Sequence, residues 1–162
     1  MHHLTSSNVK AIIPNYFLDG YECDLFVITK ADITIEYELK KSLGDYKKDF
    51  EKQKERYNWR NLETFIKSSK HELIRTGKRT NKFYFVIPEE LKDKVEVPEY
   101  AGLMVYSEYH YFKMVKRAPT LRKEKADEKI KEDIMKKLFW RLYSEIHRQL
   151  VKDENIENNV IL

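Results

Sequence analysis

The first forty residues alternate between apolar and polar positions in a way that predicts three β-strands. Apolar and aromatic residues are frequent over residues 9–18 and again over 21–28, and Asp19-Gly20 lies between the two runs. An Asp-Gly pair at that place favours a hairpin turn because both residues tolerate positive φ. Over residues 32–40, apolar side chains alternate with polar ones, which predicts a third strand with one apolar and one charged face.

The pattern changes at Ser42, where a helix is expected to begin. Ser42 is followed three residues later by Asp45, which is typical of a capped helix start. Residues 45–75 then read as a long charged helix that ends at Gly77, with room for a break near residues 58–61. Further along, the apolar run 83–87 predicts a strand buried on both faces, and residues 103–106 and 109–115 predict a pair of strands joined as a meander.

The last part of the chain predicts an amphipathic helix. Six apolar residues recur there at intervals of four, namely Ile130, Ile134, Leu138, Leu142, Ile146 and Leu150. This stripe is either core or a partner-binding face, and the small size of the chain favours core packing.

The order of elements predicts a mixed α/β fold. We expect a central mixed sheet flanked by helices, with strand 83–87 parallel to strand 32–40, because a strand that follows a helical crossover usually returns parallel. One domain is expected over residues 1–152, followed by a flexible tail over 153–162.

Composition excludes several classes of protein and of site. Cys23 is the only cysteine among 162 residues, which excludes an internal disulfide and a zinc site built from cysteines. No stretch approaches the roughly 18 consecutive apolar residues of a membrane span, and no apolar signal segment follows the start of the chain. We therefore expect a cytoplasmic protein without a membrane partner.

Charge is distributed in alternating blocks. Residues 40–82 and 113–152 carry net charges of +8 and +7, whereas residues 1–39 and 83–112 each carry −4. Basic blocks beside an acidic pocket could steer a polyanion towards bound cations. Solvated helix faces would give the same counts, so the counts alone leave both interpretations open.

Glu38, Lys40 and Asp24 form the candidate constellation for chemistry. Glu38 and Lys40 lie two residues apart on the predicted third strand, so both leave the same face, with the Leu39 carbonyl between them. Asp24 on the preceding strand can sit opposite. Such oxygens suit Mg²⁺, and a lysine beside them can orient or help deprotonate a water that attacks a phosphodiester. The same triplet is also typical of a solvated strand face with a minor ion pair.

The sequence around these residues resembles the PD-(D/E)XK nuclease superfamily, in particular its MmcB-like DNA-repair group and related phage-borne endonucleases. The similarity begins at Cys23-Asp24-Leu25-Phe26-Val27 and at Ile35-Glu36-Tyr37-Glu38-Leu39-Lys40. It continues over residues 70–72, 81–91, 97–103 and 116–143, and so covers most of the chain from residue 21 to residue 143.

The resemblance implies a restriction-endonuclease-like fold, a DNA substrate and Mg²⁺ or Mn²⁺ as cofactor. It implies Asp24 and Glu38 as metal ligands, together with the Leu39 carbonyl, and Lys40 as the catalytic lysine. Cys23 stands where the family has a proline, and too few residues precede the first strand for the N-terminal helix that can supply another acid. Glu22 could substitute as an outer ligand, or the protein could bind DNA without cutting it.

Five basic or imidazole side chains are candidate contacts to DNA phosphates: Lys41, Lys47, Lys48, Lys70 and His71. Acids interleaved with the helix lysines favour local ion pairs equally well. A surface pair near a helix end is the alternative for the last two. Three functions follow as hypotheses: a metal-dependent DNA nuclease, a non-catalytic DNA-binding or repair-scaffold module, and a domain that binds an acidic protein partner.

Overall fold

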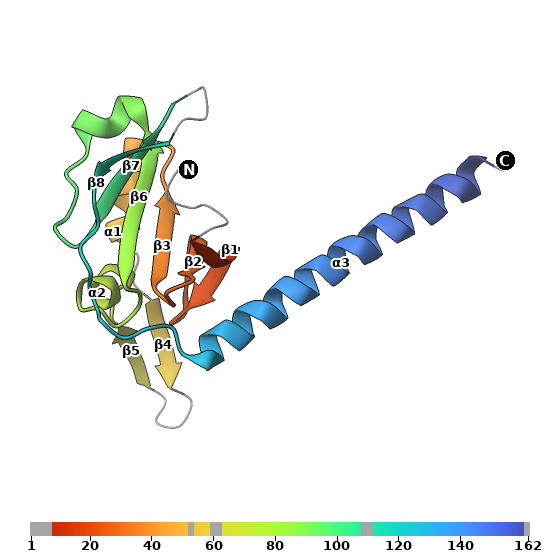
Figure 1. Cartoon of the computed structure of the whole chain (residues 1–162), viewed down its shortest axis with the longest axis horizontal. Coiled ribbons are helices and arrows are strands. Elements are labelled where there is room, and N and C mark those ends of the chain that lie inside the picture. Colours follow the sequence, from red (N-terminus) through yellow and green to blue (C-terminus); the bar gives the residue numbers. More distant parts are fainter. Residues whose placement is uncertain (1–7, 52–53, 59–62, 108–111, 161–162) are drawn as a thin grey trace. The chain divides into compact units, whose positions relative to one another are not determined.

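The computed structural model describes residues 8–51, 54–58, 63–107 and 112–160. It divides into two compact units, residues 1–125 and residues 126–162, and each is described by itself. The first unit contains an open, mixed six-stranded sheet (Figure 1), which confirms the predicted mixed α/β class. The strands lie in the order β1 (Val9–Leu18), β2 (Tyr21–Thr29), β3 (Thr34–Leu39), β6 (Lys82–Pro88), β7 (Gly102–Tyr106) and β8 (Phe112–Lys116).

The predicted hairpin and the predicted parallel pair are both present. β1 and β2 pair antiparallel across Asp19 (φ 50°) and Gly20 (φ 82°), two positive angles that match the twist of a tight hairpin. β3 pairs antiparallel with β2 and parallel with β6. β7 is parallel to β6, and β8 returns antiparallel to β7 as the expected meander. Residues 109–111 of the last predicted strand lie outside the described residues.

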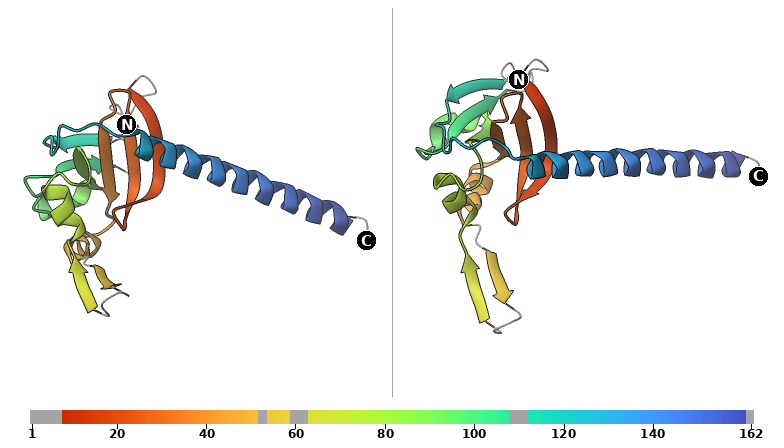
Figure 2. Two further views of the ribbon diagram at one scale, coloured as in Figure 1. Left: turned by 90° about the horizontal axis from the view of Figure 1, so that it is seen from below. Right: turned by 60° about the horizontal axis from the view of Figure 1, so that its bottom comes forward.

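The prediction of one long helix over residues 45–75 is wrong. That segment forms a short helix α1 (Leu43–Phe50), an antiparallel hairpin of β4 (Lys54–Asn58) and β5 (Glu63–Lys67), and a second short helix α2 (Lys70–Arg75). Figure 2 shows this hairpin extending away from the six-stranded sheet. Regularly spaced charges gave the segment a helical appearance, but Tyr57, Phe65 and Ile66 favour strands. Of the expected break at 58–61, Asn58 is the last residue of β4, and residues 59–61 lie outside the described residues.

Capping serines begin both short helices, and a glycine ends α2. Ser42 Oγ accepts a hydrogen bond from the Asp45 N–H at 3.1 Å, which confirms the predicted start of α1. Ser69 caps α2 in the same way. Gly77 ends α2 at φ 67°, and its N–H donates to the Ile74 carbonyl at 2.9 Å.

Apolar side chains are buried on both faces of the sheet. On one face Phe83, Phe85 and Ile87 pack with Tyr46 of α1 and Ile74 of α2. The other face is covered by a second cluster that consists of Val27, Ile35, Tyr37, Tyr84, Val86, Met104 and Ala118. β6 is thus buried on both sides, as its continuous apolar run predicts. A 3₁₀ helix, η1 (Glu89–Lys94), follows it.

The second unit is one helix, α3 (Glu128–Val160), which confirms the predicted C-terminal helix and extends it to residue 160. Several large apolar side chains on it are exposed, among them Met135, Phe139 and Ile146. That the apolar stripe of this helix packs into a core stays a prediction. None of the helices in the described part of the chain is both long and apolar enough to cross a bilayer.

Candidate active site at the end of strand β3

The charged face of β3 is buried, which corrects the alternative of a solvated strand face. Glu36, Glu38 and Lys40 are 0%, 2% and 3% exposed. Strand register places Glu36 beside Phe83 and Glu38 beside Phe85. These glutamates therefore share the face that α1 and α2 cover, so the site lies in the interior of the first unit.

Lys40 begins a chain of buried polar contacts. Its Nζ lies 2.9 Å from Glu38 Oε1 and 2.9 Å from Oδ1 of Asp49, a fully buried residue of α1. Asp49 Oδ2 lies 2.8 Å from His71 Nε2, and His71 Nδ1 lies 3.0 Å from the Tyr100 hydroxyl. The chain thus links β3, α1, α2 and the loop before β7.

Lys70 of α2 holds the two glutamates of β3 together. Its Nζ lies 2.5 Å from Glu38 Oε2 and 3.0 Å from Glu36 Oε1, and it donates to the Glu22 carbonyl at 3.0 Å. Three acceptors match the three protons of an ammonium group. Burial alone would lower the pKa of Lys70, but the charges of Glu36 and Glu38 outweigh it and raise that pKa above its usual range.

Arg79 completes the partners of Glu36. Its Nε lies 2.7 Å from Glu36 Oε2 and its terminal NH2 group 3.2 Å from Oε1, a bidentate pair. The same guanidinium donates to the carbonyls of Leu18 and Tyr21. Burial acts to raise the pKa of Glu36, but the charges of Lys70 and Arg79 prevail and hold it below its ordinary value.

We call these side chains the buried charge network: Glu36, Glu38, Lys40, Asp49, Lys70, His71 and Arg79. It contains three carboxylates and three lysine or arginine side chains. The charges balance without a divalent ion, as burial of ionised groups requires.

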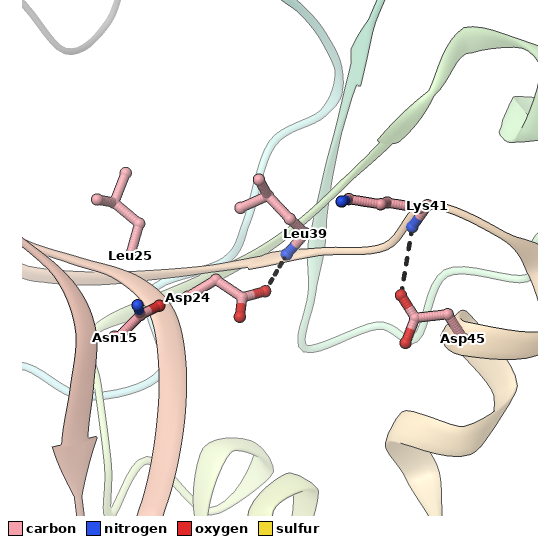
Figure 3. Close-up of a pocket in the computed structure, with 6 residues that line it drawn as sticks. All are labelled: Asn15, Asp24, Leu25, Leu39, Lys41 and Asp45. Atoms are coloured by element: carbon pink, nitrogen blue, oxygen red, sulfur yellow. Dashed lines mark hydrogen bonds between the residues drawn. The ribbon is translucent and has the colours of Figure 1, made fainter.

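Asp24 borders a pocket beside this network. Its Oδ2 accepts a hydrogen bond from the Leu39 N–H at 2.7 Å. The pocket has a volume of about 400 Å³ (Figure 3) and is lined by Asn15, Asp24, Leu25, Leu39, Lys41 and Asp45. Leu39 and Lys41 are exposed, whereas Glu38 and Lys40 are buried, as the alternation of a strand requires. The structure thus joins Glu38 to Lys40 and brings the Asp24 carboxylate to the backbone between them.

The five candidate phosphate contacts fall into two groups. Lys41, Lys47 and Lys48 are exposed, the first in the pocket wall and the others on α1. Lys70 and His71 are buried and engaged with carboxylates, a placement that suits neither direct contact with DNA nor the surface pair considered as its alternative.

Glu22, the candidate outer ligand, is exposed. It is the Glu22 backbone carbonyl that faces the network, where it accepts a hydrogen bond from Lys70. Its carboxylate therefore has no described role in holding the network together.

The donor groups near Leu39 fit Mg²⁺ in number and kind. Mg²⁺ in proteins usually takes one or two carboxylates and keeps several waters. Asp24, Glu38 and the Leu39 carbonyl supply such a set, although Glu38 would have to exchange an ammonium partner for the ion. Over residues 8–51, 54–58, 63–107 and 112–160, no group of three or more His, Cys, Asp or Glu side chains is placed to hold a metal ion.

Sequence reasoning missed four members of the site: Glu36, Asp49, Arg79 and Tyr100. The two-residue period that links Glu38 to Lys40 also includes Glu36, so that signal was available. Asp49 follows Tyr46 by one helical turn, which puts it on the buried side of α1. Nothing in the local sequence marks Arg79 or Tyr100, whose partners are 43 and 29 residues away.

Comparison with known proteins gives a fold relationship. No protein-family model and no curated protein matches the chain. The solved structure of SPO1766, a protein of unknown function from Silicibacter pomeroyi, is similar with a TM-score of 0.52 and 12% sequence identity. The match covers 83% of this chain and 75% of that one. The chain therefore shares a fold with SPO1766.

Proposed function

We propose that the protein is a Mg²⁺- or Mn²⁺-dependent nuclease of the PD-(D/E)XK type that hydrolyses DNA phosphodiester bonds in the cytoplasm. The observation that carries the proposal is the hydrogen bond of 2.7 Å between Asp24 Oδ2 and the Leu39 N–H. It holds a carboxylate at the backbone position between Glu38 and Lys40, which are themselves 2.9 Å apart. Asp24 and Leu39 line an open pocket there, and the buried Glu38 and Lys40 flank Leu39 along β3.

Each residue has a role in this proposal that follows from its chemistry. Asp24, Glu38 and the Leu39 carbonyl would hold the ion, which supplies charge neutralisation at the phosphate and a more acidic water. Lys40 donates two of its three ammonium protons to Glu38 and Asp49. The third is suited to orient the attacking water or a phosphate oxygen. Asp49, itself held by His71, fixes the direction of that ammonium group.

The exposed lysines supply the part of the site that would contact DNA. Lys41 lies in the pocket wall, while Lys47 and Lys48 lie on the exposed side of α1, which begins three residues after Lys40. Lysine ammonium groups at such positions can neutralise backbone phosphates without reading sequence. We infer that DNA approaches across the pocket and the start of α1.

Cleavage assays with a matched pair of variants test the proposal. Plasmid, single-stranded and branched DNA are incubated with wild type, Asp24→Asn and Asp45→Asn in the presence of Mn²⁺ or Mg²⁺. An asparagine at residue 24 can still accept the Leu39 hydrogen bond but loses the charge that a metal ligand needs, so the cleavage rate should fall about 100-fold or more. Asp45 lines the same pocket, and its variant should cleave at nearly the wild-type rate. Equal rates for all three proteins would contradict the assignment.

A non-catalytic DNA-binding module of the same fold is the second candidate. It is favoured by one observation, namely that Glu38 and Lys40 are almost completely buried and neutralise each other and their neighbours. This candidate predicts DNA binding that weakens with salt, and no cleavage with either divalent ion. Failure to bind any DNA at low salt would contradict both candidates and favour a protein partner.

A further inference from the structure

Helix α3 carries an exposed apolar stripe that the proposed nuclease function does not use. Seven large apolar or aromatic side chains on it are each exposed by 51% or more. Trp140 lies beside the stripe, and the other six share one side of the helix: Met135, Phe139, Leu142, Tyr143, Ile146 and Leu150. A contiguous exposed apolar surface of this kind usually marks an interaction site. α3 is one continuous helix of 33 residues (Figure 1), so the stripe lies on a regular scaffold.

The stripe is symmetric about its own centre. Because an α-helix rotates by about 100° per residue, these six side chains fall within an arc of about 100° around the helix axis. The steps between them are 4, 3, 1, 3 and 4 residues, which read the same in both directions. An antiparallel copy of the helix, centred between Leu142 and Tyr143, therefore places Met135 opposite Leu150 and Phe139 opposite Ile146. Such a two-fold contact uses the same patch on both copies.

Charges on α3 favour the same orientation. Residues 128–142 contain five basic and three acidic residues, a net charge of +2, whereas residues 143–160 contain two basic and four acidic residues, a net of −2. An antiparallel pair sets each positive half beside a negative half, and a parallel pair would set like beside like. Each exposed ion pair contributes little free energy, but together such pairs favour one register and one orientation of the two helices.

We propose that α3 pairs antiparallel with α3 of a second copy of this chain, and that the six-residue stripe is the contact. The helix carries seven basic and seven acidic residues over residues 128–160, so it has no net charge to attract an anionic lipid surface. The symmetric spacing of the stripe and the opposite charges of the two halves of α3 are complementary to a second, antiparallel copy of the same helix. The pairing is independent of the nuclease proposal.

Molar mass measured by light scattering tests the pairing on the full chain. Wild type should have twice the chain mass of 19.6 kDa at concentrations of about 100 µM and approach the chain mass on dilution. Phe139→Glu puts a charge within the stripe, opposite Ile146 of the other copy, and should give a monomer. Ser144→Glu adds the same side chain on the opposite side of the helix and should remain dimeric. Circular dichroism verifies that both variants keep their helix content.

Disulfide trapping tests the orientation. The double variant Met135→Cys, Leu150→Cys should form a covalent dimer under oxidation, because residue 135 of one copy faces residue 150 of the other. Met135→Cys alone should not, since its two copies would lie about 22 Å apart along the helix axis, beyond the reach of a disulfide. Cys23 can stay in place because it is buried, and burial raises the pKa of its thiol to about 12.

Four results would overturn the proposal. They are a wild type that is monomeric at the highest concentration, a dimer that Phe139→Glu leaves intact, a monomer that instead binds vesicles of anionic phospholipid, and efficient trapping by Met135→Cys alone. The first three reject the stripe as a self-association surface, and the last replaces the antiparallel pair with a parallel one.

Discussion

At the scale of single residues, Lys70 is the side chain on which the buried charge network most depends. Its ammonium group donates to Glu36, Glu38 and the Glu22 carbonyl, and it is fully buried. Arg79 also contacts Glu36, and Lys40 also contacts Glu38, but Lys70 contacts both glutamates. Its removal would leave two interior carboxylates short of a counter-charge.

We predict that Lys70→Met lowers the free energy of unfolding by about 3–5 kcal/mol, the usual cost of removing one partner from a buried ion pair. Urea titration followed by circular dichroism measures the change. Lys47→Met makes the same substitution at an exposed position of α1 and should alter the free energy of unfolding by less than about 0.5 kcal/mol. Similar losses in the two variants would show that Lys70 is not the principal counter-charge.

The catalytic candidates were partly predictable at this scale. Glu38 and Lys40 are in contact because side chains two apart on a strand share a face, which is a local rule. That their face is buried depends on α1 and α2, which pack over it from later in the chain. The contact between Asp49 and His71 joins residues 22 apart in sequence, and no local pattern encodes it.

At the scale of elements, Gly77 and Gly44 show how differently two glycines can matter. Gly77 ends α2 with a φ of +67°, and a Cβ there would overlap the Leu121 carbonyl. Gly44 lies in the first turn of α1, where the nearest atom to an added Cβ is Ser42 Oγ at 3.9 Å. Only the first position requires glycine.

We predict that Gly77→Ala destabilises the protein by about 2 kcal/mol or more, since it combines a strained φ with a backbone clash. Gly44→Ala should be neutral or should stabilise by up to about 1 kcal/mol, because alanine is the better helix former and restricts the unfolded chain. Thermal unfolding of the two variants beside wild type measures the difference. An equal effect at both positions would contradict this account of how α2 ends.

Prediction of elements succeeded where the signals were local. β1, β2 and β3 follow from alternation and from Asp19-Gly20, and the start of α1 and the end of α2 follow from Ser42 and Gly77. The hairpin of β4 and β5 was missed because charged residues spaced as on a helix outweighed the strand preference of its aromatic and branched residues. The secondary structure of such short segments depends on their surroundings in the fold as much as on the intrinsic preference of their residues.

At the scale of the whole molecule, the uneven charge distribution affects how the protein would bind DNA. Lys41, Lys47 and Lys48 lie at or near the pocket, whereas Lys30 follows β2 at the opposite end of β3. If DNA crosses the pocket, these three lysines release counterions from its phosphates and Lys30 does not.

We predict that Lys47→Gln lowers the slope of log affinity against log salt concentration by about one unit, as the loss of one phosphate contact requires. Lys30→Gln removes the same charge at the far end of the strand and should leave the slope unchanged. Fluorescence anisotropy with a labelled duplex, repeated over a series of salt concentrations, measures both slopes. Equal decreases in the two variants would indicate that DNA binds elsewhere or diffusely.

If the proposed nuclease function is correct, the electrical neutrality of the interior beside β3 couples the binding of a metal ion to the binding of DNA. Three carboxylates already match three lysine or arginine charges there, so two extra positive charges from a lone divalent ion would be poorly compensated. A phosphodiester brings one negative charge and Asp24 offers another, which together restore the balance. Metal and DNA should accordingly each raise the affinity for the other by the same factor. The protein without DNA should therefore bind divalent ions weakly.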